Sequence, residues 1–295
     1  MVDQESQEPG PPSASALGRL DAWMARHPWH PRVVPFLVYC VFLVLTGLAL
    51  ERLPVAYPLI YSVQCGLVLA LLWRYRRLLP ELTLRFHWLA LPVGAGVAAA
   101  WIALGLWMVE LFPHAFADLA QADFRDPDRM GPSVGWIALG LRLVGMSVVV
   151  PMFEELFVRS LLLRSLARSD RTFTGLVQVA QDIPVLGEWI MKTRVGIRAD
   201  RQPPVFGREF ETNPLGRITV FGVAASTLVF ASYHHPRDFM GILVCGVAYC
   251  LLVSATNRRQ PGRPDHGLGP VIWAHGITNA LLWVYTLGTG DWQFL

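Results

Sequence analysis

Long apolar runs recur through this chain at about the length that crosses a lipid bilayer. A hydrocarbon core about 30 Å thick takes about 20 residues of helix. The runs predict seven membrane-spanning helices, at residues 33–50, 55–73, 87–112, 135–153, 217–234, 238–256 and 270–288. The composition agrees, because 53% of the 295 residues are hydrophobic and only 16% are charged. We therefore expect an all-α, polytopic transmembrane bundle of about seven spans, with roughly six to eight as the range.

The charged residues of the loops predict how these spans are oriented. Arginines gather before the first span, after the second, through segment 164–208 and again at 258–263, and arginine-rich loops lie on the cytoplasmic side of membranes. The loop between the third and fourth spans is acidic, with Asp118, Asp123, Asp126 and Asp128. We therefore place the N-terminus in the cytoplasm and the C-terminus outside. The formal net charge of +3 follows from these loops and predicts no nucleic-acid partner.

The same pattern divides the chain into four parts. Residues 1–30 begin polar and rich in proline and serine, so we expect a disordered cytoplasmic tail without a cleavable signal peptide. The other parts are the first spans and outer loop at 31–134, a core at 135–290 with a cytoplasmic or interfacial insertion at about 166–216, and the C-terminal end at 291–295. Within the insertion, residues 173–192 predict an amphipathic helix at the membrane surface.

Charged side chains interrupt one of the apolar stretches. In VVVPMFEELFVRSLLLR, residues 148–164, Glu154 and Glu155 precede Arg159, although an ionisable side chain at the bilayer centre costs at least about 2.5 kcal/mol. Glu155 and Arg159 are four residues apart and share a helix face, so they can pair. Glu154 is turned by about 100° from its neighbour and is left free to react. A buried ion pair that only joins helices is the alternative for this stretch.

Histidines and an amide occupy two later apolar runs. Phe230 and His234 are four apart in TLVFASYHHP, and His275 and Asn279 are four apart in VIWAHGITNALLW. A glutamate and a histidine can activate a water as general base. A second histidine and an asparagine can donate hydrogen bonds to the oxygen that becomes negative when this water attacks a peptide carbonyl. The set predicts peptide hydrolysis inside a membrane.

In order and spacing, these residues resemble three motifs of the CPBP (CAAX protease and bacteriocin-processing) glutamic intramembrane endopeptidases. The matches are EExxxR at Glu154, Glu155 and Arg159, FxxxH at Phe230 and His234, and HxxxN at His275 and Asn279. The resemblance covers about residues 135–290 and implies a CAAX-protease-like bundle that needs no cofactor. It implies that Glu154 and His234 activate the water, that His275 and Asn279 form the oxyanion hole, and that Glu155 and Arg159 brace the site.

The flanks of the first and last motifs resemble the exosortase-associated branch of this family. That branch implies a bacterial cytoplasmic membrane and a membrane-associated protein substrate, cleaved near a C-terminal sorting or anchoring segment. Many family members have glycine where Ser160 stands.

Other assignments of the chemistry stay open from the sequence. His235 duplicates the motif histidine next to His234 and could be the base instead. A zinc ion held by His234, His275 and Glu154 is an alternative to metal-free chemistry, although no HExxH and no GxSxG is present. GTGD at 288–291 echoes aspartyl intramembrane proteases, but the YD pair that accompanies it in those enzymes is missing, so we interpret it as coincidence.

Two features of the sequence do not fit simply. The expected span limits place Glu154 about 28 Å along its helix and His234 about 26 Å along another, near opposite membrane faces, so the two cannot meet. Either the fifth span begins inside the insertion, or the fourth helix breaks at Pro151, or a span is miscounted. Arg142 is a further intramembrane charge, which we expect to pair with Glu110 or an outer-loop aspartate, or else to hold a substrate carboxylate.

Two functions of other classes compete with the protease. One is a catalytically silent membrane scaffold or immunity-type protein of the same fold. The other is a small proton-coupled transporter that uses the acids and histidines as a relay.

Overall fold

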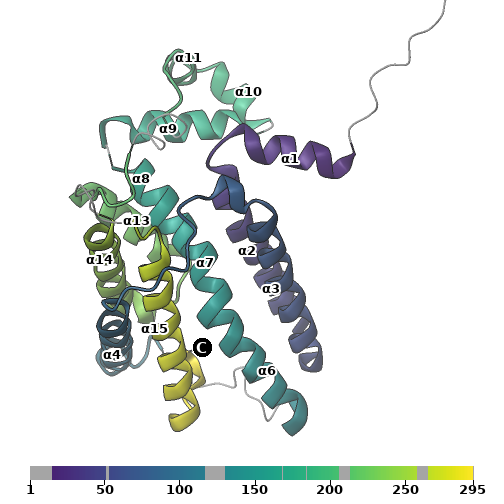
Figure 1. Cartoon of the computed structure of the whole chain (residues 1–295), viewed down its shortest axis with the longest axis vertical. Helices are drawn as coiled ribbons and strands as arrows, with labels where there is room; N and C mark the ends of the chain where they lie inside the picture. The colour runs from purple at the N-terminus through teal and green to yellow at the C-terminus, as the bar shows by residue number, and fades with distance from the viewer. Residues whose placement is uncertain are drawn as a thin grey trace, which may run out of the picture.

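Helices are the regular secondary structure of the described part of the chain. The computed structural model describes residues 15–50, 53–116, 130–167, 169–183, 185–205, 213–257 and 265–294, and these ranges contain no strand. Long helices form a bundle, and short helices lie across one of its ends (Figure 1). This agrees with the predicted all-α class.

Five helices in these ranges are long and apolar enough to cross a membrane. They are α2 (His30–Leu50), α3 (Tyr57–Arg74), α4 (Ala90–Leu111), a continuous helix from Ser133 to Ser165, and α14 (Phe239–Thr256) with the turn before it. Their length and composition are those of an integral membrane protein. The predicted bounds of the fifth span, 217–234, are too wide, because α13 (Val220–Ser232) has 13 residues and is only about 20 Å long.

The helix Ser133–Ser165 runs the length of the bundle (Figure 1). It consists of α6 (Pro132–Val144), the π-helical η4 (Gly145–Val149), α7 (Val150–Glu155), the π-helical η5 (Leu156–Leu162) and α8 (Leu163–Ser165). The expected end at residue 153 is wrong, and the helix does not break at Pro151. The π segment before this proline changes the hydrogen-bond pattern, since Val150 N–H bonds to Gly145 O, and such segments let a helix continue through irregular positions.

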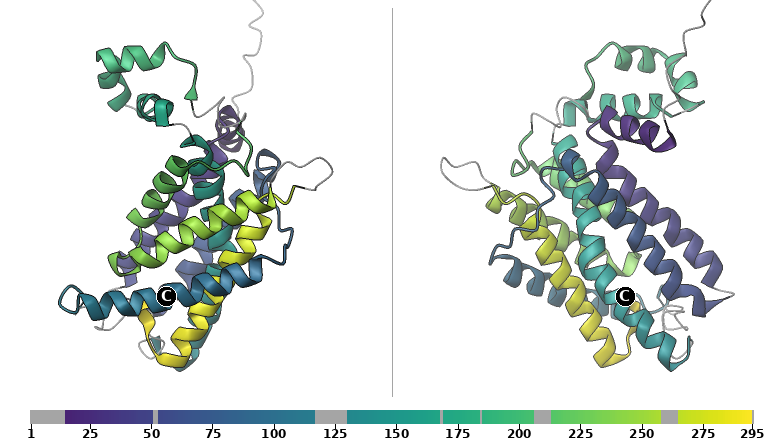
Figure 2. Two further views of the ribbon diagram at one scale, coloured as in Figure 1. Left: turned by 90° about the vertical axis from the view of Figure 1, so that its left-hand side faces the viewer. Right: turned by 45° about the vertical axis from the view of Figure 1, so that its right-hand side comes forward.

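We call the helix Ser133–Ser165 the rod, and the remaining long helices flank it. In Figure 1, α2 and α3 lie on one side, and α4, α13, α14 and α15 (Gly269–Thr289) lie on the other. Figure 2 shows α4, α14 and α15 crossing one another closely. α15 contains the polar residues His275, Thr278 and Asn279, which lower its hydropathy, and it is outside the group of five spans.

Short helices cover the end of the bundle where the N-terminus enters. The expected disorder of residues 1–30 is wrong for α1 (Ala16–Arg26), because the Ser15 hydroxyl caps it through Gly18 N–H and Met24 is fully buried; residues 1–14 lie outside the described part. The insertion holds α9 (Ser169–Gln181), α10 (Leu186–Met191) and α11 (Arg194–Asp200). The single helix expected at 173–192 is therefore two helices, since a proline follows at 184.

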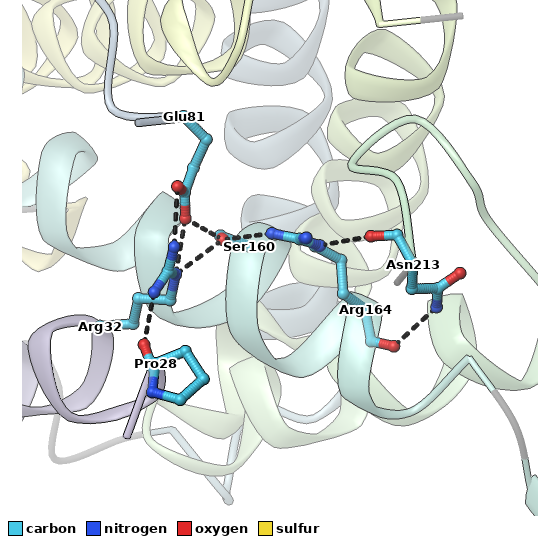
Figure 3. A network of polar contacts seen from close by, with 6 residues as sticks. All are labelled: Pro28, Arg32, Glu81, Ser160, Arg164 and Asn213. Atoms are coloured by element: carbon cyan, nitrogen blue, oxygen red, sulfur yellow. Dashed lines mark hydrogen bonds and ion pairs between the residues drawn. The ribbon is translucent and has the colours of Figure 1, made fainter. Parts of the chain in front are cut away.

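A buried polar network fastens α2 to the rod (Figure 3). Arg32 donates to the Glu81 carboxylate through Nε at 2.6 Å and through Nη2 at 2.8 Å. The Ser160 hydroxyl donates to Glu81 Oε1 at 2.5 Å. One turn on, Arg164 and Asn213 exchange two hydrogen bonds of 2.9 Å. Burial raises the pKa of Glu81, but the Arg32 charge and the bonds from Arg32 and Ser160 lower it more, and the net shift is downward.

Replacing Glu81 with glutamine is expected to destabilise the bundle by about 3 kcal/mol, because a buried arginine loses its counter-charge. In thermal unfolding followed by a thiol-reactive dye, which reports the buried Cys245 and Cys250, this is a fall in Tm on the order of 10 °C. Asp21→Asn is the matched control, since the Asp21–Arg74 pair is about 45% exposed.

The effect of Glu81→Gln should depend on pH. A carboxyl group whose pKa is lowered by folding adds stability at pH values above its ordinary pKa. This stability is lost as the pH falls through the lowered pKa. The difference in Tm between wild type and variant should therefore shrink in acid. Equal Tm values at neutral pH would contradict the expectation.

Candidate active site in the bundle core

A cavity of about 280 Å³ lies inside the bundle. Three helix faces wall it: Phe36, Tyr39, Cys40 and Leu43 of α2; Arg142, Met146, Val150 and Glu154 of the rod; and His275, Thr278, Asn279 and Leu282 of α15. Trp101 of α4 and the turn after α13, which carries His234, also line it. The cavity thus brings together five of the seven motif residues, Glu154, Phe230, His234, His275 and Asn279.

The other two, Glu155 and Arg159, lie behind this cavity with no exposed surface. Arg159 Nε is 3.3 Å from Glu155 Oε2, which is the i, i+4 contact expected from the sequence. The guanidinium carbon also lies 5.0 Å from the ring centroid of Phe230 and 5.4 Å from that of Tyr249. Aromatic faces attract cations. One acid and two rings therefore stabilise this buried charge.

Glu155 also fixes His275. The Nδ1 atom of His275 is 2.8 Å from Glu155 Oε1, so this nitrogen donates to the carboxylate. The opposite ring nitrogen, Nε2, lies 3.8 Å from Glu154 Oε2. Among the described residues, the Glu154 side chain accepts no hydrogen bond. The two adjacent acids therefore differ in surroundings: Glu155 is engaged by a base and a cation, whereas Glu154 faces the cavity.

His234 reaches the cavity, whereas its neighbour does not. His234 Nδ1 bonds to the Phe230 carbonyl at 2.8 Å, and the two rings lie 4.5 Å apart, which leaves Nε2 free to face the cavity. His235 is exposed, and its Nδ1 accepts a hydrogen bond from Arg237 N–H at 3.3 Å. Phe230 therefore touches both Arg159 and His234, which gives the phenylalanine of the FxxxH motif a structural role.

Asn279 joins α15 to the π-helical segment of the rod. Its Nδ2 donates to the Met146 carbonyl at 2.7 Å, and the second N–H of the amide is left for the cavity. The helices approach closely here, because a Cβ added at Gly276 would lie 2.4 Å from the Ser147 carbonyl oxygen. Only glycine allows this approach, so Gly276 sets the depth at which Asn279 meets the rod.

The helix lengths remove the conflict in depth. Glu154 is followed by eleven more residues of the rod, up to Ser165, and so lies within the bundle instead of at its end. His234 follows a helix of 13 residues, which is too short to carry it to the opposite face. The first two explanations fail, because α13 begins only at Val220 and the helix is continuous through Pro151; the number of spans stays a prediction.

Several cavity residues were not anticipated from the sequence. The Tyr249 hydroxyl bonds to Thr278 Oγ1 at 2.7 Å, and Trp101 Nε1 donates to Asp238 at 3.3 Å. Phe294, near the C-terminus, returns to line the cavity. Tyr249 and Trp101 stand out only as aromatic residues in apolar runs, which is a weak signal because such residues are common in spanning helices.

Arg142 does not pair with Glu110, the first of the partners expected for it. Its Nη1 donates to the Tyr57 hydroxyl at 2.7 Å, and it makes no ion pair with Glu110 or with any other described acid. The outer-loop aspartates at 118, 123, 126 and 128 lie outside the described residues.

No protein-family model, curated protein or solved structure matches this chain. Within the described residues, no group of three or more histidine, cysteine, aspartate or glutamate side chains is arranged to hold a metal ion. The choice between metal-free and zinc chemistry, and the roles assigned to the six residues, therefore stay predictions.

The two glutamates should respond differently to neutralisation. Glu155→Gln leaves Arg159 buried without its counter-charge and is expected to cost about 3–5 kcal/mol. Glu154→Gln removes a charge whose nearest basic group is His275 Nε2 at 3.8 Å, and the fold should be retained. The check is thermal unfolding of both variants in the same detergent. A Glu155→Gln protein as stable as Glu154→Gln would show that the Arg159 pair does not support the core.

Proposed function

We propose that this protein is a glutamic-type intramembrane endopeptidase. The observation that carries the proposal is the cavity that gathers Glu154, His234, His275 and Asn279 from three separate parts of the chain, inside a bundle of apolar helices. A purely structural ion-pair network has no need of a cavity beside its second acid.

The proposed reaction uses one water. Glu154, with His234 beside it, takes a proton from the water while the oxygen adds to the peptide carbonyl carbon. The carbonyl oxygen becomes negative and accepts hydrogen bonds from Asn279 Nδ2 and from His275 Nε2 when that nitrogen carries a proton. Glu154 then gives the proton to the leaving nitrogen as the C–N bond breaks. Glu155 and Arg159 hold His275 and the rod in place.

The finer features of the proposal follow the motif resemblance. We assign the chain to the CPBP group with a CAAX-protease-like bundle of about seven spans, the short α13 and the polar α15 counting as the two beyond the five apolar helices. The substrate is a membrane-associated protein cleaved near its C-terminal segment. The protein would lie in a bacterial cytoplasmic membrane with its N-terminus inside, and would need no cofactor.

Glu154→Gln is expected to abolish cleavage while the protein stays folded and abundant. The measurement is mass-spectrometric mapping of peptide termini in membranes of cells that express either wild type or variant at equal level. Glu188→Gln, an exposed acid of α10, is the control and should match wild type. If no terminus depends on Glu154, the acids are structural and the scaffold function takes precedence.

The two adjacent histidines provide a second test. His234→Ala should lower the cleavage rate at the same terminus by at least about a hundredfold, the usual contribution of a general base. His235→Ala should change it little, because His235 is exposed and outside the cavity. The reverse order of effects would move the base to His235.

A further inference from the structure

Arg142 lines the cavity of the apolar bundle and has no acidic partner among the described residues. Arg142 is half-buried, and the three fully buried arginines of the described residues, Arg32, Arg159 and Arg237, each lie within 3.3 Å of a carboxylate oxygen. Within the described ranges, Arg142 bonds only to the Tyr57 hydroxyl, and its buried Nε has no hydrogen-bond partner. An unneutralised cation at membrane depth is costly. An anion that the described residues do not supply would offset this cost.

The position of Arg142 indicates where this anion would lie. Arg142, Met146, Val150 and Glu154 follow one another at intervals of four along the rod, and all four line the cavity. A chain bound along this face would meet Glu154 at one end and the guanidinium at the other. With Nη1 held by Tyr57, the Nε edge of the guanidinium is left for a ligand, and that edge suits a planar carboxylate.

We propose that Arg142 binds a carboxylate of the substrate and so sets which peptide bond lies at Glu154. The inference rests on the proposed function, since it takes Glu154 as the reacting end of the cavity. Arg142 is here a binding residue that acts on specificity and has no part in the proton transfers.

The separation fixes the expected distance along the substrate. Arg142 and Glu154 are twelve residue steps apart along the helix, which rise about 18 Å, and an extended peptide covers about 3.3–3.6 Å per residue. The carboxylate therefore lies about five residues from the scissile bond. It can be an aspartate or glutamate side chain or the C-terminal carboxylate, because the guanidinium recognises both alike.

The experiment uses the full-length protein in lipid nanodiscs and a library of short mixed-sequence peptides. The library is made once as free acids and once as C-terminal amides, and products are mapped by mass spectrometry. Proteins compared are wild type, Glu154→Gln, Arg142→Gln, Arg142→Lys, and Arg198→Gln as a matched control from the exposed face of α11. For the best substrate, kcat and KM are measured with its carboxylate present and neutralised.

Wild type is expected to select peptides with a carboxylate about five residues from the cleaved bond. Neutralising that carboxylate, or introducing Arg142→Gln, should raise KM on the order of tenfold or more, with little change in kcat. The two changes together should cost no more than one alone. Arg142→Lys should recover part of the loss, and Arg198→Gln should match wild type. Loss on amidation identifies a terminal carboxylate, and loss on Asp→Asn or Glu→Gln in the peptide identifies a side chain.

Cleavage that ignores the carboxylate, or an Arg142→Gln defect that is equally large with neutral peptides, would overturn the assignment of Arg142. If wild type and Glu154→Gln give the same products, the protease proposal fails. The role of Arg142 is then tested by peptide binding instead of cleavage. Fluorescent free-acid peptides must then bind Glu154→Gln more tightly than their amides or neutral analogues, and adding Arg142→Gln must abolish the preference. Equal affinities would overturn it.

Discussion

The ion pair between Glu155 and Arg159 is the interaction on which the core depends. Both side chains have no exposed surface, and taking two charges out of water is costly unless they are closely matched. Here the acid also receives His275, and the arginine also lies against Phe230 and Tyr249. One pair therefore ties together the rod, α13, α14 and α15, and it leaves Glu154 as the acid that no other charge engages closely.

The same turn of the rod is fastened on its other face. Ser160 follows Arg159 directly and donates to Glu81, which in turn binds Arg32 of α2. Position 160, where many proteins of the family that this chain resembles have glycine, thus carries a hydroxyl that bonds to Glu81. The network of Arg159 and the network of Ser160 start at adjacent residues and extend in different directions. The turn beside the acids therefore cannot slide or rotate without breaking the contacts of one network.

Much of this arrangement could be predicted from local pattern. Apolar run length gave the five long helices, and four-residue spacing gave the Glu155–Arg159 contact and the shared face of His275 and Asn279. Hydropathy does not show where a helix ends within apolar sequence. The predicted span 135–153 is therefore shorter than the rod, and the predicted span 217–234 is longer than α13. The α2 wall of the cavity, the Gly276 approach and the contact of Phe294 depend on packing between distant segments, which no local pattern reports.

The π-helical segment Gly145–Val149 sets the relative directions of Arg142 and Glu154 on the rod. In a regular α-helix, residues twelve apart differ by about 120° in direction, so Arg142 and Glu154 would look away from each other. A π segment takes up one residue in excess, and the remaining eleven steps bring the two within about 20°. The alignment therefore depends on the count of residues more than on their identity. Deleting or inserting a single residue between them would turn one of the two charges out of the cavity, even if every side chain that lines it were kept.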